Sequence, residues 1–444
     1  MNTIALLSAP IVPSILRLAA PNMLAMTVML ATSAAEAWYV GQLGTAALAG
    51  LALAFPMFML MTMMSAGAMG GAVAGAVAQA LGAGNRDHAE RLALHAILIA
   101  LVVGGLFSLV FLTLGTSIYG MLGGSDEVLQ EALAFSNMLF AGCISIWLLN
   151  FLSSVVRGCG HMRAAATMMI ITSFTQIGLG ALFVFGWGPI PGMGITGAAL
   201  AAILGSTFGA VLLLLYLMSG KAAVRLSLRA ISFRQAEFAH LLRPGLLACV
   251  SPLSSVGSAI VITALVARLG PEVLAGYGIG VRLEFLLIPI IFGIGAALIT
   301  LVGVHFGANE VDRGHKIAWI GAFGAALVTG FIGGVLALFP DLWANLFTDV
   351  ETVREACRLY LRIAGPSYGF FGLGLALYFA SQGARRLFWP VAAGAFRLLV
   401  VSIGGLILIY YWGPTIENVF ALVALGMLTL GVTIAFAIKL GAWR

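Results

Sequence analysis

The sequence has few charged residues for its length. Of its 444 residues only 9% are charged, whereas 61% are hydrophobic and the mean hydropathy is +1.09. Soluble domains carry about 25% charged residues, and a single soluble core does not grow to hold that much apolar sequence. The composition therefore excludes a soluble globular protein and indicates a polytopic membrane protein.

Residues that carry catalysis or bind metals are equally scarce. The four cysteines form no CxxC or Cys/His pattern, so we interpret them as small core residues; they are Cys143, Cys159, Cys249 and Cys357. The six histidines are dispersed, and no P-loop, GxSxG or HExxH motif is present. We expect no metal site, no cofactor and no enzymatic activity. The N-terminal stretch MNTIALLSAPIVPSILRLAA lacks a basic region followed by a small-residue cleavage site, so we expect no removable signal peptide.

Long apolar runs dominate the sequence instead. Twelve of them are long enough to cross a bilayer, which takes about 20 residues of helix. They lie at 13–39, 46–78, 90–115, 131–156, 163–187, 194–218, 244–267, 276–306, 316–340, 359–381, 388–412 and 417–440. The second and eighth runs are longer than needed, and Pro56 and the glycines near 276–280 suggest bent, broken or tilted helices there. The pattern predicts an all-α polytopic membrane protein with twelve transmembrane helices.

The basic residues gather on one side of these runs. If the N-terminus is cytoplasmic, the inner loops and termini hold Arg17, Arg86, Arg91, Arg157, Arg163, Lys221, Arg225, Arg229, Arg234, Arg243, Arg313, Lys316, Arg385, Arg386, Lys439 and Arg444. The outer loops hold mainly Arg268 and Arg354, with Arg358 and Arg362 entering the tenth run, and acids such as Asp126 and Asp341. This bias predicts that both termini are cytoplasmic. It also assigns the net charge of +6 to membrane topology and not to nucleic-acid binding.

The chain repeats itself with an offset of about 225 residues. LGTAALAGLAL at 43–53 matches LGPEVLAGYGI at 269–279, QALGAGNRDHAERLA at 79–93 matches VHFGANEVDRGHKIA at 304–318, and WGP recurs at 187–189 and 412–414. The longest polar segment, 219–243, lies between the copies. We predict two six-helix bundles with pseudo-two-fold symmetry, at 1–218 and 244–444, joined by a cytoplasmic connector at 219–243. Such parallel repeats are typical of alternating-access transporters.

At these same segments the chain resembles the multidrug and toxic compound extrusion (MATE) family. EAWYVGQLG resembles the end of the family's first helix, QALGAGN and VHFGANE its inner-loop signature, RGCGHMR and SQGARR its paired glycine-rich turns, and GMGITGAALA the start of its sixth helix. The resemblance implies twelve helices around a central cavity and export of organic cations or amphipathic compounds in exchange for H+ or Na+. It carries the first-helix acid onto Glu36. The other family acids would fall near Gly180, Ser255 and Phe371, where none is present.

Glu36 is an ionisable residue inside the first span, where a charge costs about 2.5–3.5 kcal/mol or more. No basic residue falls within the membrane region of its own half, so burial favours the protonated form of the carboxyl group. We expect Glu36 to bind protons and substrate cations in turn. The alternative is that it reaches interfacial water at the outer end of its helix. Possible coupling-site neighbours on nearby spans, each also suited to ordinary helix packing, are Asn22, Thr32, Ser33, Asn150, Thr175 and Gln176.

Three further intramembrane charges lie in the C-terminal half: Arg282, Glu284 and Arg397. Arg282 and Glu284 are two residues apart, about 200° around a regular helix, so they pair only if the glycines of GYGIGVRLE break that helix. Otherwise Arg397 is the natural partner of Glu284. Two hypotheses stay open: a fixed ion pair that stabilises the bundle, or a role in proton coupling or substrate binding.

Flexible and aromatic side chains suggest a substrate cavity. Met57, Met61 and Met64 share one face of the second span, and methionine suits surfaces that repack around varied ligands. Tyr368, Phe371 and Tyr378 in the tenth span offer aromatic contacts to a cation. Ordinary packing or lipid contact is the alternative for both groups.

From these observations we predict a multi-pass inner-membrane antiporter. We expect its partners to be the lipid bilayer and small organic, cationic substrates, and we expect no nucleic acid. It would export cationic or amphipathic compounds in exchange for protons, as a monomer. The alternatives are a Na+-coupled multidrug antiporter, a flippase for lipid-linked precursors, and, from a different class, a non-transporting membrane receptor or an enzyme. A flippase would carry a more cationic cavity, and a receptor or enzyme a signalling domain or catalytic cluster, which this sequence lacks.

Overall fold

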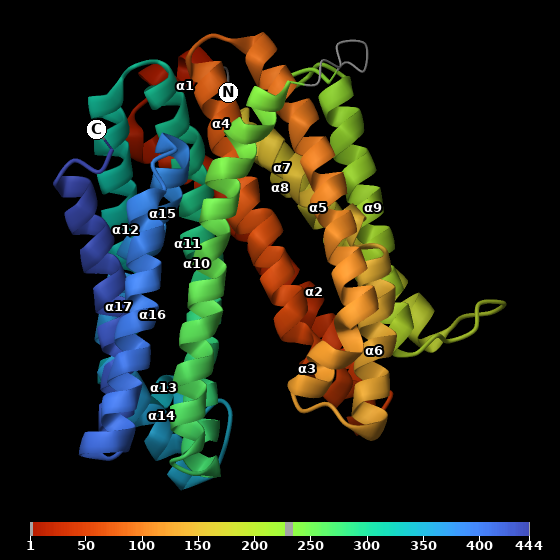
Figure 1. The fold of residues 1–444 in the computed structure, drawn as a ribbon, viewed down its shortest axis with the longest axis vertical. Helices are drawn as coiled ribbons and strands as arrows, with labels where there is room; N and C mark the ends of the chain where they lie inside the picture. The colour runs from red at the N-terminus through yellow and green to blue at the C-terminus, as the bar shows by residue number, and fades with distance from the viewer. Residues whose placement is uncertain (1–2, 227–233, 444) are drawn as a thin grey trace. The chain divides into compact units, whose positions relative to one another are not determined.

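The computed structural model describes residues 3–226 and 234–443 of the chain, and throughout them the regular elements are helices (Figure 1). An isolated bridge between Trp187 and Ile190 is the one β-type pairing among these residues. The predicted all-α fold class is therefore confirmed. Of the basic residues assigned above to the inner side, Arg229 and Arg444 lie outside the described residues.

The membrane-spanning potential of the helices also matches the sequence prediction. Within the described parts of the chain, eleven helices are long and apolar enough to cross a membrane, and the number is twelve if a bent pair forms one span. The first elements are α1 (Thr3–Ser8), α2 (Ile11–Gly41), α3 (Thr45–Thr62), the π-helix η1 (Met63–Met69), α4 (Gly70–Gly82), α5 (Arg86–Met121), α6 (Asp126–Ala141), α7 (Cys143–Gly158), α8 (Met162–Phe185) and α9 (Ile195–Met218). They are followed by α10 (Gln235–Ala267), α11 (Pro271–Gly307), α12 (Val311–Leu338), α13 (Asp341–Ala344), α14 (Glu351–Ala364), the 3₁₀ turn η3 (Gly365–Ser367), α15 (Tyr368–Ala384), α16 (Phe388–Ile407), the π-helix η4 (Leu408–Trp412) and α17 (Ile416–Lys439).

The chain forms two compact units. Unit 1 comprises Met1–Leu6 and Pro21–Gly245, and unit 2 comprises Leu7–Ala20 and Leu246–Arg444. Most of α2, including Glu36, thus belongs to unit 1, whereas α11 to α17 belong to unit 2. The boundaries at 218 and 244 stay predictions.

Unit 1 is held together by helices packed around α7. This helix contacts α4, α5, α8 and α9, and it carries Trp147, which is fully buried. Beside it the rings of Phe111 and Phe140 stack with centroids 3.9 Å apart, and the hydroxyl groups of Tyr119 and Ser136 are hydrogen-bonded at 2.8 Å. Aromatic rings bury large areas and give such helix contacts their specificity.

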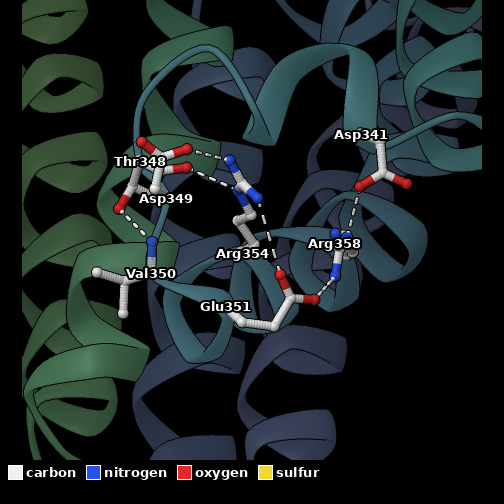
Figure 2. Close-up of polar contacts among 7 residues, drawn as sticks. All are labelled: Asp341, Thr348, Asp349, Val350, Glu351, Arg354 and Arg358. Atoms are coloured by element: carbon white, nitrogen blue, oxygen red, sulfur yellow. Dashed lines mark hydrogen bonds and ion pairs between the residues drawn. The ribbon is translucent and has the colours of Figure 1, made fainter.

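Unit 2 is built in a similar way around α15, which contacts α11, α12 and α17. The short α13 and the start of α14 are tied together by an ion-pair network (Figure 2). Arg358 on α14 contacts Asp341 on α13 at 2.6 Å and Glu351 at 2.5 Å, while Arg354 contacts Asp349 at 2.7 Å. These charge-assisted contacts, two of which share Glu351, orient the first turns of α14.

The fourth apolar run differs from the prediction of one straight span over 131–156. It consists of α6 and α7, which are bent by 53° at the break between them. The break lies at Gly142, where a Cβ atom would come within 2.6 Å of the Ile203 side chain on α9. The Ile203 side chain packs directly against the backbone at this point, and the bend accommodates it.

The two overlong runs differ from each other. In the second, the π-helix η1 follows Pro56 by two turns, so the regular helix is interrupted as the sequence suggested. In the eighth, α11 is one unbroken helix from Pro271 to Gly307, and a break near residues 276–280 is wrong. The glycines there allow close packing with α14 and do not interrupt the helix.

The internal repeat is visible in the packing of each unit. A Cβ atom at Gly158, at the end of α7, would lie 2.6 Å from the carbonyl oxygen of Ala74 on α4. A Cβ atom at Gly383, near the end of α15, would lie 2.5 Å from the carbonyl oxygen of Ile299 on α11. Both members of the second pair follow those of the first at the same offset as the sequence repeat. The repeat therefore preserves a close helix–helix contact that requires glycine.

We expect Gly158→Ala to lower the stability of the transmembrane fold. The added methyl group overlaps the Ala74 carbonyl oxygen, and such overpacking costs about 1–3 kcal/mol. The midpoint of thermal unfolding in detergent should fall. Gly105→Ala on α5 is the matched control, because a Cβ atom there meets nothing within 4 Å. An equal midpoint for Gly158→Ala and Gly105→Ala would contradict the close contact.

All four cysteines are free and buried. Cys159 lies between α7 and α8, outside the spanning helices, and burial raises the pKa of its thiol to about 12. Since the thiolate is the reactive form, a maleimide at mildly alkaline pH should not label the folded protein. After unfolding in detergent, all four thiols should react. Rapid labelling of the folded protein would show that this packing is wrong.

Candidate functional site

Glu36 lies on the stripe of α2 that faces the interior of unit 1. Thr32 and Val40, one turn before and one turn after it, are 6% and 0% exposed. Side chains four residues apart share one face of a helix, so the Glu36 side chain leaves the helix on its buried side. The residue as a whole is half-buried, but its carboxylate atom Oε1 is fully covered.

The carboxylate of Glu36 has no compensating charge. Its Oε1 atom has no hydrogen-bond partner. The ion pairs among the described residues involve other acids, so no arginine, lysine or histidine lies within 4.0 Å of Glu36. A fixed ion pair, which would remove the site from consideration, is thus absent among the described residues.

Aromatic packing fixes this part of α2 against α8. Tyr39 donates a hydrogen bond from its hydroxyl group to the carbonyl oxygen of Ile177 at 3.2 Å, and its ring packs edge-on against Phe185 with centroids 5.8 Å apart. A Cβ atom at Gly180 would lie 3.1 Å from the Tyr39 ring. The position where the family resemblance would place a second acid is therefore filled by Tyr39, which leaves Glu36 as the acid of this site.

Four of the six polar residues predicted as coupling-site neighbours are hydrogen-bonded to groups other than Glu36. Thr32 and Thr175 donate to the carbonyl oxygens of Val28 and Ile171 on their own helices, both at 2.9 Å. Helical threonine commonly forms such a bond. Ser33 is exposed and Gln176 is half-buried.

The two asparagines in that group contact residues other than Glu36 through their side-chain amides. Asn22 Nδ2 lies 3.2 Å from the sulfur of Met162, and Asn150 Nδ2 donates to Ser65 Oγ at 2.8 Å. None of the six residues donates a hydrogen bond to Glu36 Oε1.

A second polar network in unit 1 was missed from the sequence. Ser65 lies on the π-helix η1 and binds Asn150 on α7, Ser154 donates to the carbonyl oxygen of Asn150 at 2.7 Å, and Arg157 donates to Ser154 at 2.8 Å. Arg157, which was assigned to an inner loop, instead lies in the last turn of α7 and is 6% exposed. The spacing of Asn150, Ser154 and Arg157 on one helical face was the available signal.

The three intramembrane charges of unit 2 lie apart. Because α11 is regular, Arg282 and Glu284 point in different directions. Arg282 is exposed, with its guanidinium 5.5 Å from the centroid of the Phe347 ring. Glu284 accepts a hydrogen bond from the hydroxyl group of Tyr360 on α14.

Arg397 lies on α16, with its guanidinium 5.8 Å from the centroid of the Phe371 ring. It attracts Glu284 electrostatically but forms no ion pair with it within 4.0 Å, and its Nε atom has no hydrogen-bond partner. The predicted fixed ion pair between Glu284 and Arg397 is therefore wrong in this conformation. Tyr360, and not Arg397, is the residue that contacts the Glu284 carboxylate directly.

The residues predicted to line a substrate cavity differ in their exposure to solvent. Met61 is fully buried, whereas Met57 and Met64 are half-buried, and Met64 lies within the π-helix and not on the regular face of α3. Tyr368 is fully buried, and the Tyr378 hydroxyl group donates to the carbonyl oxygen of Ala248 at 3.2 Å. Phe371, under Arg397, is half-buried.

Curated proteins similar to the chain are transporters. It is 25% identical over 382 residues to an FAD transporter of Shewanella oneidensis, covering 85% of this chain and 82% of that protein. It is also 25% identical to the probable multidrug resistance protein NorM of Thermotoga maritima, covering 85% of this chain and 81% of that protein. Both alignments span most of the two sequences.

A solved structure has the same fold. A MOP superfamily transporter from Pyrococcus furiosus superimposes with a TM-score of 0.91 and 22% sequence identity, covering 100% of this chain and 98% of that chain. The MatE family model matches residues 21–182 and 248–408, one match in each half of the sequence. These matches identify a multi-pass membrane transporter and not an enzyme: the chain belongs to the MatE family, the multidrug and toxic compound extrusion transporters.

Proposed function

We propose that this transporter is a proton-coupled antiporter that exports cationic or amphipathic small molecules, with Glu36 as the exchange site. The observation that carries the proposal is the covered carboxylate oxygen of Glu36, which has neither a hydrogen-bond donor nor a cation beside it. A buried carboxylate in this situation is stabilised by taking up a proton. The deprotonated group instead attracts a cation.

Exchange follows from these two states of one group. A proton bound to Glu36 leaves the carboxyl group neutral and removes its attraction for a cationic substrate. Loss of that proton to the other side of the membrane restores the negative charge and the attraction. Alternating exposure of the site to the two sides then couples proton entry to substrate export.

The surroundings of Glu36 favour H+ over Na+ as the coupling ion. A sodium ion is bound best by several oxygen atoms at once. A second acid that would help to hold a sodium ion is absent, because Gly180 occupies its position and lies against the Tyr39 ring. A proton needs only the carboxylate itself.

The remaining expectations on topology and assembly belong to this proposal. The distribution of basic residues supports cytoplasmic termini and insertion in the inner membrane. Each unit has its own buried core, which supports a monomer as the working transporter. The Shewanella oneidensis relative is named an FAD transporter. The anionic compound FAD is therefore the substrate to test against cationic dyes.

The test is efflux from proteoliposomes under imposed gradients. We expect a pH gradient to drive export of cationic dyes at constant sodium concentration, and a sodium gradient at constant pH to drive none. A panel of cationic dyes should be exported in preference to FAD. Export that follows the sodium gradient, or that is confined to FAD, would contradict the proposal.

We expect Glu36→Gln to reduce gradient-driven efflux to the level of protein-free liposomes, because the amide neither binds a proton nor attracts a cation. The variant should fold normally, since it replaces a buried carboxyl group with a neutral group of the same shape. Glu127→Gln, at an exposed acid on α6 of the same unit, is the control and should transport like the unmodified protein. Undiminished efflux by Glu36→Gln would refute the assignment.

A further inference from the structure

Unit 2 contains a second acid within a spanning helix, Glu284 on α11, which is half-buried in a site built by close helix packing. A Cβ atom at Gly276 would lie 2.6 Å from the Ala356 side chain on α14, and one at Gly280 would overlap the ring of Tyr360. These glycines therefore let α14 lie directly against α11. The phenol of Tyr360, which is fully buried, thereby reaches Glu284 one helical turn beyond Gly280 and donates a hydrogen bond to it.

The position of Tyr360 is fixed from the other end of α14. Arg354 and Arg358, on the turns before it, are held by Asp349, Asp341 and Glu351 (Figure 2). The Tyr360 ring also packs edge-on against Phe420 on α17, with centroids 5.1 Å apart. The hydrogen bond to Glu284 is thus made by a side chain that has little freedom to move away.

The other titratable groups around Glu284 leave its charge only partly compensated. They are Tyr277 on α11, Tyr360 on α14, Tyr368 on α15 and Arg397 on α16. Arg397 attracts the carboxylate but is not in contact with it. A direct ion pair would hold Glu284 permanently charged, whereas this arrangement does not.

Tyr360 suits a carboxyl group that changes its protonation state. A phenol is both a donor and an acceptor. It donates to the charged carboxylate, and after rotation of its hydroxyl hydrogen it accepts from the protonated carboxyl group. The same two oxygen atoms therefore stay hydrogen-bonded in both states.

Arg397 also lies beside a small cavity that is lined by polar groups of other helices. It borders a cavity of about 10 Å³, the size of one water molecule, on the side of α10. The polar groups that line this cavity are Ser251, Ser254 and Ser255 on α10 and Tyr378 on α15. Arg397, which senses the charge on Glu284, thus borders polar groups of α10, and a change in that charge is expected to alter the contacts between α16 and α10.

We propose that Glu284 is a second proton-exchange site, located in unit 2, so that each transport cycle moves two protons. This inference rests on the proposed function of Glu36 as the first site. In each cycle one proton binds to and leaves the carboxyl group of each residue, and no covalent bond to other atoms is made or broken.

Infrared spectroscopy of the protein in lipid nanodiscs tests the inference without transport. As the pH is raised, the unmodified protein should lose two bands of the protonated carboxyl C=O stretch. Glu284→Gln should remove one band and Glu36→Gln the other. The control is Glu272→Gln, at the exposed acid in the first turn of α11, which should keep both. Identical spectra for Glu284→Gln and the unmodified protein would overturn the proposal.

Tyr360→Phe gives a second readout that does not depend on the folding of Glu284→Gln. Loss of the hydrogen bond should move the Glu284 band to a different frequency while both bands remain. A spectrum unchanged by Tyr360→Phe would also overturn the proposal.

The number of protons moved is measured from the membrane potential at which dye exchange reverses. We expect two protons per dye for the unmodified protein and one for Glu284→Gln. If Glu36→Gln abolishes exchange while Glu284→Gln leaves the stoichiometry unchanged, the proposed function stands and this inference fails. If Glu36→Gln exchanges normally, the proposed function fails, and the infrared result still decides whether Glu284 titrates.

Discussion

The account depends on one electrostatic constraint: a carboxylate inside a membrane protein that has no counter-charge. The Oε1 atom of Glu36 is covered and has no partner. Water does not reach that atom, and the cations that contact carboxylates elsewhere, such as Arg354 and Arg358 around the acids near α13, have no equivalent beside it among the described residues. The free energy of the site therefore changes strongly when a cation or proton arrives.

The rest of unit 1 keeps that constraint in place. Tyr39 packs α2 against α8 where Gly180 allows it, and this contact excludes a second acid. The hydroxyl and amide groups nearby are satisfied by their own helices or by the network of Ser65, Asn150 and Arg157 around the π-helix. A π-turn is a frequent feature of functional sites because it releases backbone groups from the regular pattern. In unit 2, the charge on Glu284 is compensated only in part, by a hydrogen bond from Tyr360 and by the electrostatic attraction of Arg397.

Much of the fold was predictable because the membrane imposes simple rules on sequence. Apolar runs predicted the spanning helices, and the resemblance predicted the family that the comparisons established. What the sequence did not give depends on contacts between distant residues. The bend at Gly142 is associated with Ile203 on another helix, and α11 stays regular because its glycines pack against α14. For the same reason Tyr360, and not Arg397, contacts Glu284, and Arg157 is buried in α7 and not in a loop.

Proton release on substrate binding tests the central claim most directly. Purified protein in weakly buffered solution is mixed with a dye that it exports, and the pH of the solution is followed. The account predicts that binding displaces a proton from Glu36, so that the unmodified protein acidifies the solution and Glu36→Gln loses that release. Binding of the dye to the unmodified protein without acidification, or equal acidification by Glu36→Gln, would contradict it.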